Sequence, residues 1–227
     1  MEDLPLYAAD LEKNCGTGAG GFQPGNTCGA GGGSAREEAY SGKTIRPKLV
    51  AELREREDLI RRSSIEHGVV YAKSGNRIML KHGSSDRVRF TREEIDMIKR
   101  HSDVVFTHNH PSGRAFSMDD VVWAHHVGTI AELRAVAPDG TVYRMRPPKD
   151  GWGALTGDQI KDTYLQADSD ADDKVRPRLE SLMDRGKLEP VEADRVHTHW
   201  VMQRVAKRLG LEYERVLGEG VELAEVA

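Results

Sequence analysis

The sequence predicts an α/β fold in which helices flank a mixed β-sheet, and two patterns support this class. Short apolar or alternating runs between about 68 and 146, separated by turn residues, are typical of strands. Longer runs with apolar residues three or four positions apart, at 45–62 and again beyond 157, are typical of amphipathic helices. Because strands and helices alternate along 45–150, we expect one α/β domain there.

The expected elements of this domain follow one another at short intervals. A helix over 45–62 precedes a hairpin of strands at 68–72 and 77–81. Thr91 and Glu94 form a capping box that begins a second helix. A short buried strand at 103–107, a helix that Ser117 caps and Gly128 ends, and a hairpin over 132–145 complete the domain.

Two further regions flank the domain. Residues 1–44 include a glycine-rich stretch with Cys15 and Cys28, which buries too little surface to offset its backbone entropy, so we expect a flexible segment. Residues 151–227 form a helical C-terminal region that could dock a protein partner. Its helices are expected near 157–167, 172–185 and 191–209, with the acidic run Asp168–Asp173 separating the first two.

Composition narrows the class of protein. No apolar run reaches the roughly 18–20 residues of a membrane span, and two cysteines do not make a secreted disulfide framework. We therefore expect a cytoplasmic protein that does not bind membranes. The net charge of −4 argues against a nucleic-acid partner.

The pattern H-x-H-P-x5-S-x-x-D, from His108 to Asp120, carries the chemistry. Two imidazoles at positions i and i+2 point to the same side of a strand. A carboxylate ten residues after His110 can return to them through a loop and the first turn of a helix. Three N/O ligands with a fourth position open are typical of catalytic zinc. The sequence therefore predicts that His108, His110 and Asp120 bind Zn²⁺.

Hydrolysis at such a site needs two further groups. A carboxylate must take the proton of the attacking water, and a donor must stabilise the developing oxyanion. Ser117, three residues before Asp120, suits the second role. Glu66 suits the first because it stands at the start of the first predicted strand, while Glu57 and Asp58 are alternatives that fall within the predicted helix.

This run resembles the signature of the JAMM/MPN-plus, or JAB, zinc metalloproteases, and its His-Asn-His-Pro-Ser-Gly stretch is similar to the RadC-like proteins. The resemblance implies a JAB/MPN-like sheet over 45–150, with His108, His110 and Asp120 on the metal, Ser117 assisting and Glu66 as general acid/base. The sequence departs from the family pattern at one point: five residues separate Pro111 from Ser117, where the family has six. A loop tolerates such a deletion if the following helix keeps its register.

Two functions are consistent with these residues. The first is a zinc metallopeptidase or isopeptidase whose substrate is a peptide or protein tail, including a ubiquitin-like conjugate. The alternative is a non-catalytic JAB-fold assembly or protein-binding module with a structural or vestigial zinc site. The glycine-rich segment followed by THNHPSGRAFS also resembles modules of phage head-morphogenesis proteins, which implies a phage-related origin.

Overall fold

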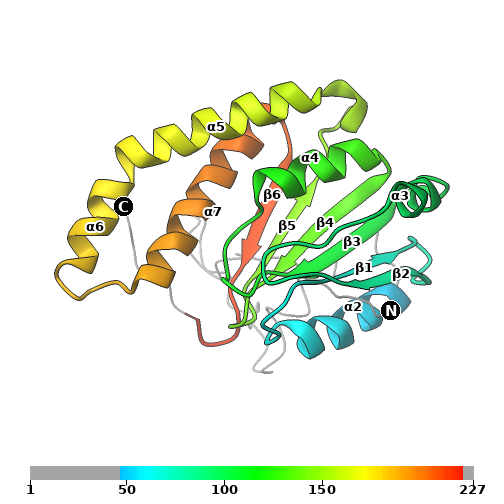
Figure 1. Ribbon diagram of the computed structural model, residues 1–227, viewed down its shortest axis with the longest axis horizontal. Coiled ribbons are helices and arrows are strands. Elements are labelled where there is room, and N and C mark those ends of the chain that lie inside the picture. Colours follow the sequence, from blue (N-terminus) through cyan, green and yellow to red (C-terminus); the bar gives the residue numbers. More distant parts are fainter. Residues whose placement is uncertain (1–46, 222–227) are drawn as a thin grey trace, which may run out of the picture.

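A six-stranded mixed β-sheet forms the centre of the protein (Figure 1). The computed structural model describes residues 47–221, so the predictions for 1–44, with Cys15 and Cys28, lie outside the described residues. The strand order is β2-β1-β3-β4-β5-β6. The strands are β1 (His67–Tyr71), β2 (Arg77–His82), β3 (Val104–Asn109), β4 (Ile130–Val136), β5 (Val142–Arg146) and β6 (Glu212–Val216).

The strand pairing agrees with the predicted fold class. Neighbouring strands are antiparallel except β3 and β4, which are parallel and are joined through helix α4 (Met118–Val127). Helix α2 (Pro47–Ile60) lies on the face of the sheet opposite α4 (Figure 1). The chain is therefore an α/β protein with a mixed sheet flanked by helices.

Two capping boxes fix where helices begin. Thr91 accepts a hydrogen bond from the backbone of Glu94 at the start of α3 (Arg92–Ile98), and Ser117 accepts one from Asp120 at the start of α4. Gly128 ends α4 in the left-handed conformation, with φ of 75°, which glycine adopts without strain. These three signals confirm the predicted helix boundaries on either side of β3.

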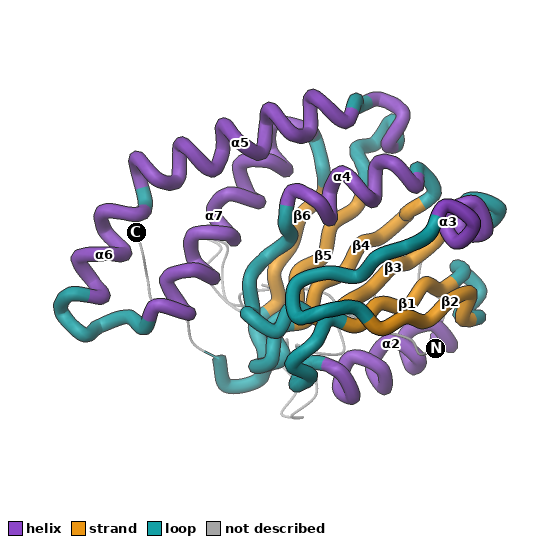
Figure 2. The backbone as a smooth tube through the Cα atoms, viewed as in Figure 1, coloured by secondary structure: helices purple, strands orange, loops and turns teal. Residues whose placement is uncertain are grey.

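The C-terminal region is more than a set of helices. It consists of α5 (Gly157–Lys174), α6 (Arg176–Met183), α7 (Pro190–Leu209) and then β6, which pairs with β5 at the edge of the sheet. Buried side chains of α5 and α7 belong to the same core as the sheet, whereas α6 packs with the start of α7 in a smaller core. In Figure 2, α6 and the adjoining helix ends project away from the sheet. The C-terminal region that we expected to be helical therefore contains helices together with one strand, β6, which was not predicted.

The acidic run Asp168–Asp173 does not separate two helices. It lies inside α5, which is continuous to Lys174. Ala167 and Ala171 are buried four residues apart, whereas Asp168 and Asp170 are partly exposed and Asp172 and Asp173 are exposed. Two of these side chains form ion pairs with basic residues, Asp170 with Lys174 and Arg208, and Asp172 with Arg176.

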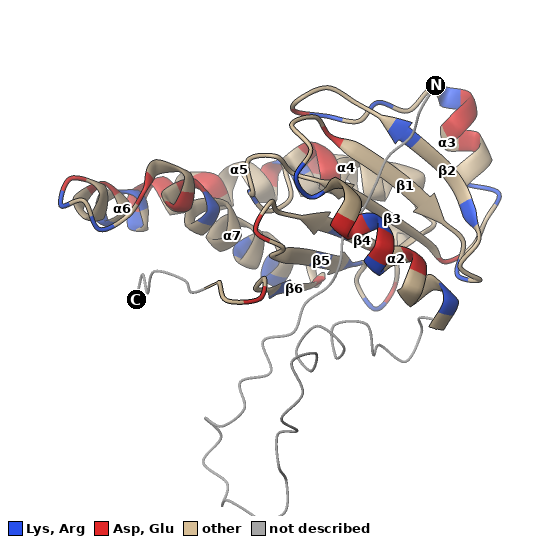
Figure 3. Ribbon diagram, turned by 90° about the horizontal axis from the view of Figure 1, so that it is seen from below, with Lys and Arg blue, Asp and Glu red and all other residues tan. Residues whose placement is uncertain are grey.

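The exposed surface of α2 is highly charged. In Figure 3 basic and acidic positions alternate along this helix. Its buried side, by contrast, presents Leu49, Leu53 and Ile60 to the core, as expected for an amphipathic helix. Among residues 47–221, no helix is both long enough and apolar enough to span a membrane.

Candidate metal centre

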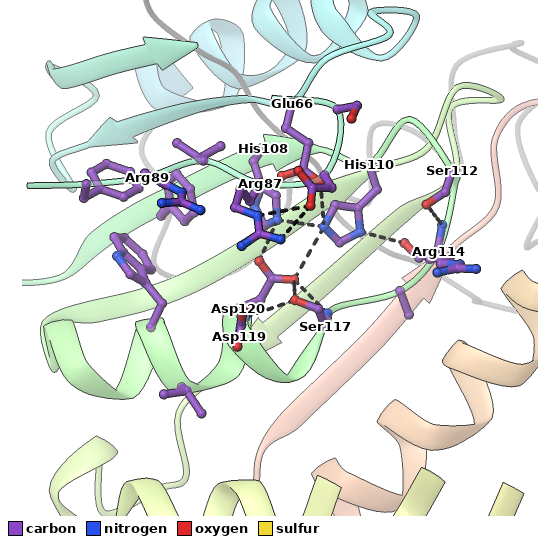
Figure 4. Close-up of a pocket in the computed structure, with 18 of the residues that line it drawn as sticks. Glu66, Arg87, Arg89, His108, His110, Ser112, Arg114, Ser117, Asp119 and Asp120 are labelled. Atoms are coloured by element: carbon purple, nitrogen blue, oxygen red, sulfur yellow. Dashed lines mark hydrogen bonds and ion pairs between the residues drawn. The ribbon is translucent and has the colours of Figure 1, made fainter. Parts of the chain in front are cut away.

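Four predicted site residues meet at one end of the sheet (Figure 4). Nε2 of His108 and Nε2 of His110 lie 2.9 Å apart. Asp120 contacts both rings, with Oδ1 3.0 Å from His108 and Oδ2 3.5 Å from His110. Oε1 of Glu66 lies 3.9 Å from Nε2 of His110 on the other side. Glu66, His108 and His110 are buried and lie close enough together to bind a metal ion.

The local structure explains why these side chains converge. His108 is on β3 and His110 follows its last residue, so the alternation of the strand points both rings to the face that α4 covers. Asp120 is at the third position of α4, and its carboxylate accepts a hydrogen bond from the backbone N–H of Ser117 at 2.7 Å. The first turn of α4 therefore faces the two imidazoles despite the shortened loop.

Glu66 lies directly before β1, in a tightly bonded segment. Its N–H donates to the carbonyl of Ser84 and its own carbonyl accepts from Gly83, which extends the β1–β2 ladder by one residue. Asn109 holds both chain neighbours of Glu66: its Oδ1 accepts from the N–H of His67 at 2.8 Å, and its Nδ2 donates to the carbonyl of Ile65 at 2.9 Å. The residue between the two histidines thus fixes the backbone that carries Glu66.

Burial and mutual contact shift the pKa values of these groups. Burial raises the pKa of Glu66 to about 7, and the nearby Asp120 adds to this, while His110 opposes it. Burial would also raise the pKa of Asp120, but contact with the two imidazoles outweighs burial and holds that pKa well below its usual range. For His110 burial favours the neutral ring, yet Asp120 and Glu66 prevail and raise its pKa to about 9.

The residues present fit a zinc ion. About 2.0–2.2 Å from a tetrahedral zinc, two ligand atoms lie roughly 3.3 Å apart. The separations of 2.9, 3.0 and 3.5 Å among His108, His110 and Asp120 bracket this value. Nδ1 of His110 donates to the carbonyl of Arg114 at 2.9 Å, an arrangement that leaves Nε2 of the neutral ring as the ligand atom. These three side chains would hold the ion.

Ser117 lines the pocket beside the four residues, where its hydroxyl donates to Oδ2 of Asp120 at 2.7 Å. The same hydroxyl accepts the backbone N–H of Asp120. Its direct effect here is therefore to orient Asp120. Donation to an oxyanion would require the hydroxyl hydrogen to turn from Asp120 towards a bound substrate.

The alternative bases do not reach this pocket. Thr107 precedes His108 on β3 and pairs with Arg134 of β4, so both point to the opposite face of the sheet. Glu57 lies on that face, 3.8 Å from Arg134. Asp58 is on the surface, where it pairs with Arg61. Glu57 and Asp58 were therefore wrong candidates, and of the three carboxylates only Glu66 lines the pocket.

The C-terminal region contains no predicted site residue, but it holds the loop between β3 and α4. The hydroxyl of Thr198 on α7 accepts the N–H of Ala115 at 3.1 Å, and Asp194 pairs with Arg114. From outside α7, Tyr143 donates to the carbonyl of Gly113 and Tyr164 to that of Phe116. Because the carbonyl of Arg114 accepts the hydrogen bond from His110, these contacts fix the orientation of the His110 ring.

Comparison with protein-family models, with curated proteins and with solved structures found no match for this chain. The site is therefore argued from its geometry. The sequence motif identified the residues that converge, but it gave no sign of Asn109 as the clamp on Glu66, or of Thr198 as the anchor of the loop. The H-x-H spacing alone directs attention to the two histidines and not to the residue between them.

Proposed function

We propose that the chain is a zinc-dependent hydrolase of peptide or isopeptide bonds. The observation that carries this proposal is the meeting of His108, His110 and Asp120 with a second, buried carboxylate, Glu66, in one pocket of about 730 Å³. A structural zinc site has four protein ligands and no need of an acid/base beside it. Three ligands with a carboxylate next to them suit the activation of water.

Each residue has a role in this proposal. His108, His110 and Asp120 hold the zinc ion, which supplies Lewis-acid polarisation of a water molecule and of the scissile carbonyl when it is bound. Glu66 takes the proton of the attacking water and delivers it to the leaving amine. The raised pKa of Glu66, about 7 without metal, suits a group that must both accept and release a proton near neutral pH.

The pocket can also position a substrate. It is open to solvent on the side of Arg87, Arg114 and Ser117, which are exposed, whereas the histidines at its base are buried. A carbonyl group that reaches the base would lie between Glu66 and Ser117. The hydroxyl of Ser117 would then serve the oxyanion, which is the role that the resemblance to JAMM proteases implies.

The test is hydrolysis of a fluorogenic peptide library by the zinc-loaded protein, with Glu66→Gln as the decisive variant. We expect Glu66→Gln to bind zinc as the unaltered protein does and to lose at least 100-fold in kcat/KM, as expected for loss of a general base. The matched control, Asp58→Asn, removes an exposed carboxylate from α2 and should retain full activity. Glu66→Gln with the same activity as the unaltered protein would refute the proposal. An unaltered protein that binds zinc but hydrolyses no peptide would favour the alternative, a non-catalytic assembly or protein-binding module.

A further inference from the structure

An aromatic pocket adjoins the candidate metal centre beside His108. Phe90, Phe106 and Trp123 line the same cavity as His108 and Asp120. The ring of Phe106 stacks on His108, with centroids 5.1 Å apart and planes 11° apart. Trp123 in turn lies 4.5 Å from Phe106 and 4.7 Å from Phe90, centroid to centroid. Apolar surface therefore begins directly beside a metal ligand.

The two elements that supply metal ligands also supply this surface. Phe106 precedes His108 by two residues on β3, so both rings project from the same side of the strand. Trp123 follows Asp120 by three residues on α4 and so occupies the same side of the helix. Trp123, which its apolar helix would assign to the core, is only partly buried. The position of the pocket relative to the ligands is thus fixed by strand and helix geometry.

The walls of the pocket are held in place. A Cβ on Gly68 would lie 2.6 Å from the ring of Phe106, so glycine at this position of β1 leaves the room that the ring occupies. Phe90 is fixed by edge contact with Phe106, at 5.5 Å, and by Lys81, whose ammonium lies 5.5 Å from its ring centre. Phe106 is buried and forms the floor, while Phe90, Trp123, Val88 and Val122 remain partly exposed around it.

We infer that this pocket binds a large apolar or aromatic side chain of the substrate, next to the scissile bond. The inference rests on the proposed hydrolase function and adds the substrate class. A peptide whose carbonyl lies at the metal centre has its neighbouring side chain within reach of Phe106, because Phe106 contacts His108 directly. Burying such a side chain against three rings favours it over glycine or a charged residue.

The test compares two sets of peptides that differ only at the residues flanking the cleavage site, with phenylalanine or leucine in one and glycine in the other. We expect the unaltered zinc-loaded protein to prefer the apolar set in kcat/KM by roughly 10- to 100-fold, the effect of burying one large side chain. Trp123→Ala and Phe90→Ala should each reduce this ratio, and Trp123→Phe should restore most of it. A ratio measured within one variant does not depend on the fraction of protein that folds.

Trp200→Ala is the control, because this tryptophan lies on α7, stacks on Arg204 and does not line the pocket. It should leave the ratio unchanged. Hydrolysis without preference, or a preference that Trp123→Ala and Phe90→Ala both leave intact, would overturn the inference while the hydrolase proposal stands. Absence of hydrolysis of every peptide in both sets would refute the hydrolase proposal, and with it the inference.

Discussion

The side chain of Asn109 binds the backbone on both sides of Glu66, at the N–H of His67 and the carbonyl of Ile65. Asn109 is fully buried and lies between the two histidines, so one residue connects the proposed metal ligands to the proposed base. The relative positions of Glu66 and His110 therefore depend on a side chain that is itself neither a proposed metal ligand nor the proposed base.

We predict that Asn109→Ala lowers both stability and activity. Two part-buried backbone groups lose their partners, at about 1–2 kcal/mol each, so the free energy of unfolding should fall by roughly 2–4 kcal/mol in urea titrations. Hydrolysis should fall further than zinc affinity, because Glu66 moves while the ligands keep their contacts. Asn76→Ala, which removes an exposed hydrogen bond with Lys48, is the control and should change either quantity little. Full activity in Asn109→Ala would show that Glu66 does not need this clamp.

The metal-free protein should show a pH dependence that comes from Glu66. Its pKa is raised in the folded state from 4.5 to about 7, so folding favours its protonated form. The resulting contribution to stability is present below pH 4.5 and is lost as the pH rises through 7. Metal-free Glu66→Gln should consequently lose less stability between pH 4.5 and 8 than the unaltered protein, by up to about 3 kcal/mol. Parallel stability curves for the two proteins would contradict the shift.

The C-terminal region should affect zinc affinity through the loop that it holds. Thr198→Val removes the acceptor of the Ala115 N–H, and the loop whose carbonyl orients His110 loses an anchor. We expect zinc affinity to fall by roughly 10-fold, as for other outer-shell changes at metal sites. Thr198→Ser should restore it.

Arg208→Gln serves as the control for the contact between α7 and the loop. It breaks an exposed ion pair between α7 and Asp170 of α5 without touching the loop. Its zinc affinity should equal that of the unaltered protein. If Thr198→Val also binds zinc unchanged, α7 contributes to the fold and not to the site.

How far the sequence predicts this structure depends on the range of the interactions. Local signals, such as the capping boxes at Thr91 and Ser117, place helix boundaries correctly because the deciding hydrogen bonds span three residues. The strand β6 was not predicted, since it follows a long helix, carries alternating charged residues and is defined by its pairing with β5. The predicted helix break at the acidic run within α5 was wrong for a related reason, because the burial of Ala167 and Ala171 depends on tertiary packing.

The distinction between local and long-range interactions applies to the site as well. The ligand motif is visible in the sequence because strand and helix periodicity place His108, His110 and Asp120 on converging faces. Glu66 was identified only by its position at the start of a strand, and its contact with His110 requires the pairing of β1 with β3. The anchoring of Ala115 by Thr198 spans 83 residues, and no spacing rule predicts such a contact.

The most direct test of the central claim is the zinc stoichiometry and affinity of the full chain, measured by competition with a chromogenic chelator. The account predicts one zinc ion at His108, His110 and Asp120, with affinity reduced at least 100-fold in His108→Ala and in Asp120→Ala and nearly retained in Glu66→Gln. A folded protein that binds no zinc, or one whose zinc binding survives His108→Ala and Asp120→Ala unchanged, would contradict the account.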